Sequence, residues 1–195
     1  MTSFDTGGMP SFHVRPLTTD DTPAYRALRL AGIGELPATF CTTYALESSL
    51  PLAHISQRLQ ANRYQIIFGA FDGDHLVAIA GLRREPIAVV HDKASVWGVY
   101  VAPVARGKGA GWQLLQATIE HACAIPELAK LRLAVAQDNH AALSLYLRCG
   151  FTLDEGALPL GMLQMQLLLP RPAIAETMSE SDVFMKINGL RKVEK

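Results

Sequence analysis

The chain carries Val99-Tyr-Val-Ala-Pro-Val-Ala-Arg-Gly-Lys-Gly-Ala-Gly111 in its middle, where an apolar run ends at Pro103 and glycines precede an amphipathic segment. This order predicts a strand, a short turn and the start of a helix. Glycines let the backbone approach a ligand closely, and the first amides of a helix have no partner within it. Those amides and the positive end of the helix dipole favour a pyrophosphate. The stretch therefore predicts a phosphate-binding turn, the alternative being a tight turn without a ligand.

The glycine spacing excludes the two commonest nucleotide-binding loops. A P-loop places a hydroxyl residue directly after its Gly-Lys pair, but Lys108 is followed by Gly109. The dinucleotide fingerprint is Gly-x-Gly-x-x-Gly, whereas Gly107, Gly109 and Gly111 give Gly-x-Gly-x-Gly. The turn must therefore serve another phosphate ligand, if it serves one.

Two motifs resemble those of one enzyme superfamily. Arg106-x-x-Gly109-x-Gly111, after a Val-x-Pro strand end, resembles the coenzyme A loop of the GNAT acetyltransferases. Downstream, Asn139-His-Ala-Ala-Leu-Ser-Leu-Tyr-Leu-Arg-Cys-Gly-Phe151 resembles the Asn-x-x-Ala-x-x-Leu-Tyr-x-x-x-Gly-Phe signature of the same superfamily. One predicted strand separates the motifs, as the family order requires. The resemblance extends from about Phe12 to Leu169 and is weak before Tyr64.

Composition limits the class of protein. A chain of 195 residues is most simply one domain, and its formal net charge of zero argues against a nucleic-acid or anionic-membrane binder. No apolar run reaches the roughly 18 residues that span a bilayer, and the N-terminus lacks the pattern of a secretory signal. The three cysteines are widely spaced, which indicates reduced thiols and no metal site. We therefore expect a cytoplasmic protein without a metal, nucleic-acid or membrane partner.

Hydrophobic periodicity and turn residues predict an α/β protein with a mixed sheet and helices on both faces. The predicted strands are 12–17, 64–71, 76–82, 94–101, 131–135, 151–153 and 163–169. The predicted helices begin at Thr22-Pro23 (broken at Gly32 and Gly34), at 52–60, after Gly109 and at 141–149, with a loop in most of 35–50. The resemblance implies the GNAT acyltransferase fold, whose central, mostly antiparallel sheet has splayed fourth and fifth strands. The resemblance covers a domain over 12–169. The polar, glycine-rich residues 1–11 predict a flexible N-terminus, and the tail 170–195, which begins Pro-Arg-Pro and ends in charge, is either disordered or forms an arm against a partner subunit in a homodimer.

The resemblance also implies how acetyl-CoA is held. Backbone donors of the turn would bind the pyrophosphate. The positive charge of Arg106 would add to this binding, and so would that of Lys108, whose alternative is to point into solvent. In the family the fourth strand separates from the fifth at a bulge, and the pantetheine arm pairs with the exposed strand backbone. One strand amide would then face the thioester oxygen, although an ordinary buried strand has the same sequence. The implied cofactor-binding residues are Val99, Tyr100, Val101, Arg106, Gly107, Lys108, Gly109, Ala110, Gly111, Asn139 and Tyr146.

Tyr146 occupies the family position that protonates the coenzyme A thiolate. A phenol has a pKa near 10, above that of a thiol, so its hydroxyl can donate to the thiolate. The alternative is that Tyr146 packs in the core of an amphipathic helix. Asn139 would contact the pantetheine arm, although helix capping alone explains an Asn at that position.

The base and the acceptor site are the least defined parts. Many relatives place a Glu on or near the fourth strand as the general base, but 94–101 contains none. The alternative is a water molecule that relays the proton to Glu35, Glu47 or His54. Each of these three residues could equally be a solvated surface group. The lack of acidic residues on that strand argues mildly against a polycationic acceptor. Trp97 and Tyr100 lie three apart, which predicts opposite faces of the strand. The candidate acceptor-binding residues are Phe40, Tyr44, Glu47 and Trp97.

These observations predict an N-acetyltransferase. It would move an acetyl group from acetyl-CoA to a primary amine of a small molecule or peptide, by direct attack in a ternary complex and without a metal. A covalent cysteine route is disfavoured, because Cys123 and Cys149 fall on predicted helices and Cys41 has no evident His partner. The alternative function is a non-catalytic acyl-CoA sensor or interaction module, which the missing base favours and the intact Tyr146 disfavours.

Overall fold

The computed structural model describes residues 11–40, 42–84, 92–154 and 161–170. Its strands are β1 (His13–Pro16), β2 (Gln65–Asp72), β3 (His75–Arg84), β4 (Lys93–Val101), β5 (Lys130–Ala136), β6 (Thr152–Asp154) and β7 (Met162–Leu168). Its helices are α1 (Thr22–Glu35), α2 (Tyr44–Ser49), α3 (Leu52–Leu59), α4 (Ala110–Cys123) and α5 (His140–Arg148), with short 3-10 turns η1 (Thr19–Asp21), η2 (Pro37–Thr39) and η4 (Pro103–Ala105). The predicted flexible N-terminus, except for Ser11, and the predicted tail, except for Pro170, lie outside the described residues, as does Cys41.

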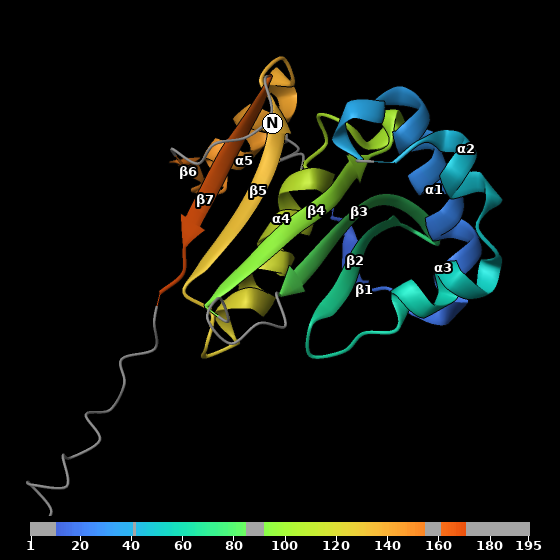
Figure 1. The fold of residues 1–195 in the computed structure, drawn as a ribbon, viewed down its shortest axis with the longest axis horizontal. Helices are drawn as coiled ribbons and strands as arrows, with labels where there is room; N and C mark the ends of the chain where they lie inside the picture. Colours follow the sequence, from blue (N-terminus) through green and yellow to red (C-terminus); the bar gives the residue numbers. More distant parts are fainter. Residues whose placement is uncertain (1–10, 41, 85–91, 155–160, 171–195) are drawn as a thin grey trace, which may run out of the picture.

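The strands form one seven-stranded sheet in the order β1-β2-β3-β4-β5-β7-β6. Neighbours pair antiparallel except β4 and β5, which are parallel. Helices α1 and α3 cover one face over β2, β3 and β4, and α4 and α5 cover the other (Figure 1). The predicted mixed α/β fold is therefore confirmed. Apolar faces of the predicted period supply the core, with Leu114 and Leu115 of α4 fully buried.

Strands β4 and β5 part after a short common ladder. They pair only at Lys93 with Lys130, Ala94 with Leu131 and Ser95 with Arg132. Beyond Ser95 the two strands diverge toward their carboxyl ends, and Figure 1 shows the gap widening between them. The predicted separation of the fourth and fifth strands is thus confirmed, and it leaves one side of β4 without a neighbouring strand.

A bulge in β4 lies beside that gap. On β3 the paired residues Ile79 and Gly81 are two apart, whereas their partners Tyr100 and Trp97 on β4 are three apart, so β4 holds one extra residue. Gly98 adopts φ +60 at this point, a conformation that glycine reaches without strain. The extra residue shifts the alternation by one, so Trp97 and Tyr100 pack into the same cluster beneath α1. The prediction that they face opposite sides of the strand was wrong for this reason.

Helix α1 continues through the two glycines at which the sequence predicts its end. The helix runs to Glu35, and Leu36 still donates to the Gly32 carbonyl at 2.8 Å. A Cβ at Gly32 would lie 2.8 Å from the Phe40 ring and 2.9 Å from the Tyr100 ring, so close packing requires this glycine. Packing therefore outweighs the roughly 1 kcal/mol that a glycine costs inside a helix. The segment 35–50, predicted mainly as a loop, contains η2 and α2.

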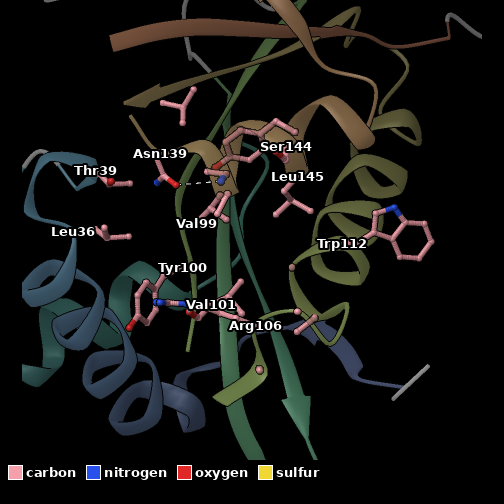
Figure 2. Close-up of a pocket in the computed structure, with 18 of the residues that line it drawn as sticks. Leu36, Thr39, Val99, Tyr100, Val101, Arg106, Trp112, Asn139, Ser144 and Leu145 are labelled. Carbon is pink, nitrogen blue, oxygen red and sulfur yellow. Dashed lines mark hydrogen bonds between the residues drawn. The ribbon is translucent and has the colours of Figure 1, made fainter. Parts of the chain in front are cut away.

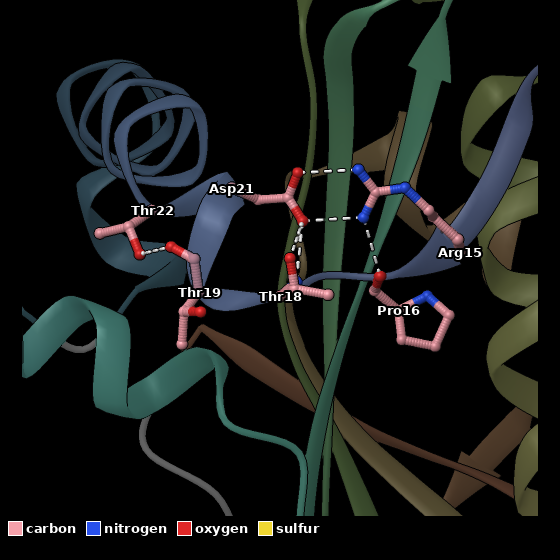
Figure 3. A network of polar contacts seen from close by, with 6 residues as sticks. All are labelled: Arg15, Pro16, Thr18, Thr19, Asp21 and Thr22. Atoms are coloured by element: carbon pink, nitrogen blue, oxygen red, sulfur yellow. Dashed lines mark hydrogen bonds and ion pairs between the residues drawn. The ribbon is translucent and has the colours of Figure 1, made fainter.

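An ion pair fixes the connection between β1 and α1. Arg15 donates to both carboxylate oxygens of Asp21, at 2.7 and 2.8 Å. Asp21 also accepts from the backbone N–H and the hydroxyl of Thr18 (Figure 3). The hydrogen bonds from Arg15 lower the pKa of Asp21 to about 2. The charge of Asp21 thus helps to fix the position at which α1 begins.

The described residues contain neither a membrane-spanning helix nor a cluster of metal-ligating side chains. None of the described helices combines the length and apolarity needed to cross a membrane. Within the same residues, no three His, Cys, Asp or Glu side chains lie close enough together to hold a metal ion.

Candidate functional site

A cavity of about 400 Å³ opens where β4 and β5 part. Its walls come from the end of α1, the second half of β4, the start of α4, the end of β5 and one face of α5. Figure 2 shows Val99 and Val101 of β4 between Leu36 and Thr39 on one side and Leu145 of α5 on the other. The cavity therefore joins both sequence motifs, and all but Lys108 of the residues predicted to bind the cofactor line it.

The amino terminus of α4 faces this cavity. Gly107 and Gly109 adopt φ +70 and +92, and Gly109 is the residue that precedes the helix. The first bond of the helix runs from the Gln113 N–H to the Gly109 carbonyl at 3.0 Å. The amides of Ala110, Gly111 and Trp112 precede that bond, so they have no acceptor within the helix. The turn thus presents amide donors and the positive end of a helix dipole to the cavity.

Gly111 allows α4, α5 and β4 to meet closely behind the turn. A Cβ at this position would lie 3.0 Å from the Leu145 Cδ2 atom and 3.2 Å from the Val101 Cγ2 atom. A Cβ there would therefore require the Leu145 and Val101 side chains to shift. The glycines of the motif therefore differ in role, since Gly107 and Gly109 shape the turn and Gly111 permits close packing.

The unpaired side of β4 supplies backbone groups to the cavity. The Ala102 N–H donates to the Val77 carbonyl at 2.8 Å, so the backbone groups of Ala102 face β3. Backbone direction alternates along a strand, which turns the groups of Val101 toward the gap. Val99 lies within the bulge and also lines the cavity. The Val101 carbonyl there accepts a hydrogen bond of 3.0 Å from the Arg106 Nε atom.

Helix α5 contributes Asn139 and Tyr146. The Asn139 side chain accepts from the Ala142 N–H at 3.1 Å, so it caps α5 while also lining the cavity (Figure 2). Tyr146 is buried, packs edge-on against Phe151 and still reaches the cavity wall. Burial raises the pKa of Tyr146 above the usual phenol value, so its hydroxyl stays protonated near neutral pH. A protonated phenol is a hydrogen-bond and proton donor.

A cluster of Glu35, Tyr100 and Arg106 closes one end of the cavity. The Glu35 Oε2 atom accepts from the Tyr100 hydroxyl and from the Arg106 Nη2 atom, both at 2.8 Å. The Arg106 Nη1 atom lies 2.7 Å from the Glu35 Oε1 atom. The Arg106 guanidinium, and then the Tyr100 hydroxyl, lower the pKa of Glu35. The sequence identified Glu35 only as a candidate base acting through a water molecule. Its contact with Arg106 could not be predicted, because the two residues lie far apart in the chain.

The residues predicted to contact the acceptor lie elsewhere. Phe40 and Trp97 pack in the core cluster beneath α1, and Tyr44 is exposed on α2. Glu47 is buried between Arg29 and Arg58, at 2.8 and 2.5 Å. These four residues do not line the cavity, and neither do the exposed Lys108 and His54. Their roles at the site stay predictions.

Several cavity residues were missed by the sequence analysis. They are Leu36, Thr39, Ala105, Trp112, Ala134, Val135, Ala141, Ala142, Ser144, Leu145 and Arg148. Ala142 lies four residues before Tyr146 on the same face of α5, so the position of Tyr146 in its motif could have indicated this residue. Leu36 and Thr39 carried no such signal, because their segment has mixed periodicity.

A second cavity of about 480 Å³ adjoins the first. It lies between η2 and the start of α5 and shares Glu35, Leu36, Thr39, Asn139 and Ala141 with the first cavity. None of the α4 turn lines it. Glu35 therefore stands where a ligand at the α4 turn and a second molecule would approach from different sides.

The cysteines of the described residues lie outside both cavities. Cys149 is buried at the end of α5, and burial raises the pKa of its thiol. A raised pKa keeps the sulfur as the poorly nucleophilic thiol.

Comparisons with known proteins agree with this geometry. A model of the acetyltransferase (GNAT) family matches residues 34–151. A ribosomal-protein-alanine N-acetyltransferase from Brucella melitensis is 25% identical with a TM-score of 0.66, and the match covers 80% of this chain and 99% of that one. The YncA protein of Salmonella typhimurium, solved with its cofactor acetyl-CoA, is 17% identical with a TM-score of 0.69, covering 86% and 99%. The PaiA N-acetyltransferase of Thermoplasma acidophilum, solved with coenzyme A, is 21% identical with a TM-score of 0.65, covering 81% and 99%. The search of curated proteins gave no significant match.

Proposed function

The chain belongs to the acetyltransferase (GNAT) family, and on that premise we propose that it moves the acetyl group of acetyl-CoA to a primary amine. The amine belongs to a small molecule or a peptide and attacks the thioester directly in a ternary complex. One observation carries the proposal. A single cavity collects the amides of the α4 turn, the unpaired side of β4 and the Tyr146 ring.

The residues present fit coenzyme A. The α4 turn offers free amide donors to a diphosphate, and Gly111 keeps that turn close to β4 and α5. The parted strands leave backbone groups of β4 without a strand partner, which suits an arm that contains amide groups. Two proteins of similar fold were solved with coenzyme A or acetyl-CoA, which supports the same ligand class here. Bound acetyl-CoA supplies the activated acetyl thioester.

The chain then contributes positioning and charge stabilisation. The amides of α4 fix the diphosphate end of the ligand, and the backbone of Val99 and Val101 aligns its arm. An amide on the same side of β4 stabilises the negative charge that develops on the thioester oxygen. The raised pKa of Tyr146 keeps its hydroxyl protonated as a hydrogen-bond donor to the departing thiolate. As the C–N bond forms and the C–S bond breaks, the thiolate takes the Tyr146 proton, and the proton that the attacking amine loses replaces it.

The second candidate function is an acyl-CoA sensor without turnover. Strand β4 offers no carboxylate to accept a proton, and Arg106 lowers the pKa of Glu35, which weakens Glu35 as a base. Both functions predict binding of acetyl-CoA in a calorimetric titration. Only the enzyme releases free thiol when acetyl-CoA is mixed with a panel of amines and peptides. A thiol signal at background for every amine, with acetyl-CoA bound, would establish the sensor instead.

A further inference from the structure

Glu35 and Tyr100 form a small site, here called the cation seat, that already holds a cation of the chain itself. The Arg106 guanidinium contacts both oxygens of the Glu35 carboxylate, and its Cζ atom lies 5.6 Å from the centroid of the Tyr100 ring. A carboxylate beside an aromatic face is the chemistry that recognises ammonium and guanidinium groups. Arg106 therefore reports which chemical class this site accepts.

The cation seat is open to exchange. The side chains of Arg106 and Glu35 are 42% and 36% exposed, so neither is locked in place by packing. Exposed ion pairs of this kind contribute little net free energy, and another cation can replace the arginine at small cost. The Tyr100 hydroxyl, which donates to Glu35 at 2.8 Å, would keep the carboxylate in place during the exchange.

The position of the cation seat fits the second substrate. Glu35 lines both cavities, and the second cavity contains none of the α4 turn to which we assign the diphosphate. A molecule that enters through the second cavity reaches Glu35 without crossing the α4 turn. Asp138, at the entry to α5, lines the same second cavity and adds negative charge on that path.

We propose that Glu35 and Tyr100 bind a cationic group of the acceptor, separate from the amine that is acetylated, and that Arg106 occupies this position until the acceptor replaces it. This inference rests on the proposed function, which supplies the amine that is acetylated. It predicts that the preferred acceptors are amines that carry a second positive charge. The fourth strand carries no acidic residue, which argues mildly against a polycationic acceptor, but here the negative charge comes from Glu35 at the end of α1.

Calorimetric titration of the whole protein tests the cation seat without requiring turnover. The probes are 1,4-diaminobutane and, as a match lacking the second charge, 4-amino-1-butanol. We expect Arg106→Gln to bind the diamine about threefold more tightly than the wild type, and Glu35→Gln to bind it about tenfold more weakly. Arg148→Gln is the matched control, since Arg148 lines the same cavity outside the cation seat, and should leave diamine affinity unchanged. The amino alcohol carries one ammonium and can also occupy the cation seat in this titration, so the uncharged control is 1,4-butanediol, which should bind all four proteins alike.

Steady-state thiol release with the same two amines gives the second readout. The wild type should show a KM for the diamine about tenfold below that for the amino alcohol, and Glu35→Gln should lose this difference. Unchanged diamine affinity in Glu35→Gln, or no gain in Arg106→Gln, would overturn the cation seat. If no protein releases thiol with any amine, the proposed function fails, while the titration still decides whether the cation seat exists. Melting temperatures of the variants confirm that each is folded.

Discussion

The Tyr146 side chain is buried among apolar residues and also lines the cavity. We predict that Tyr146→Phe lowers kcat by about a hundredfold, the usual contribution of a positioned proton donor. The ring that packs on Phe151 is retained, so coenzyme A affinity should change by less than about twofold. Steady-state kinetics and calorimetry measure the two effects separately. An unchanged kcat would reassign Tyr146 to packing alone.

Glu47 illustrates how a plausible site residue can serve the fold instead. Its carboxylate is buried between Arg29 and Arg58, and the Arg29 Nη1 atom is itself buried without a hydrogen-bond partner. Removing the negative charge would leave two guanidinium groups unbalanced. We therefore predict that Glu47→Gln lowers the free energy of unfolding in urea by about 3 kcal/mol.

A matched control separates this effect from loss of any surface charge. Glu120 is exposed on α4 and lines neither cavity, so Glu120→Gln should change the free energy of unfolding by less than about 0.5 kcal/mol. A Glu47→Gln protein as stable as the wild type but with a raised acceptor KM would instead favour the acceptor role predicted from the sequence.

Among the elements, the start of α1 should respond to pH. Asp21 titrates near pH 2 when paired with Arg15, below its ordinary pKa of 3.8, so the folded state is stabilised where Asp21 is charged. That stabilisation is complete above about pH 4 and is lost as the pH falls toward 2. Because Arg15 is partly exposed, we predict that Asp21→Asn costs only about 1 kcal/mol near pH 7. Urea unfolding at several pH values should show the gap to the wild type closing below pH 4; a constant gap would contradict it.

The junction of α4, α5 and β4 should be sensitive at Gly111. An added methyl would press on Leu145 and Val101, so Gly111→Ala should destabilise the fold by about 1–3 kcal/mol and weaken coenzyme A binding. Gly34→Ala is the matched control, because its nearest contact would be 4.0 Å away at Tyr44 and alanine favours a helix. It should raise stability by up to about 1 kcal/mol and leave coenzyme A affinity unchanged. Equal coenzyme A affinity in both variants would remove Gly111 from the account.

The elements also show where sequence reasoning succeeds and where it fails. The hairpin, the α4 turn and α5 were predicted close to their observed bounds, because turn residues and local periodicity determine them. The sequence did not predict that α1 continues past Gly32, or that the bulge in β4 places Trp97 on the same face of the sheet as Tyr100. Both depend on contacts between segments far apart in the chain, which local pattern does not encode.

For the whole molecule, the proposed function depends on the separation of β4 from β5 within the sheet. Two motifs separated by a predicted strand were enough to predict the fold and the turn for the diphosphate. The link of Glu35 to Tyr100 and Arg106 was not predictable, because the end of α1, β4 and the α4 turn meet only in the folded chain. The proposed catalysis uses the gap that opens where β4 and β5 part.

A crystal structure of the protein with acetyl-CoA would show directly where this ligand binds. We predict the diphosphate on the amides between Gly107 and Trp112, with the pantetheine arm beside Val99 and Val101 in the gap between β4 and β5. Acetyl-CoA bound anywhere else, with the α4 turn and the gap left empty, would contradict this prediction.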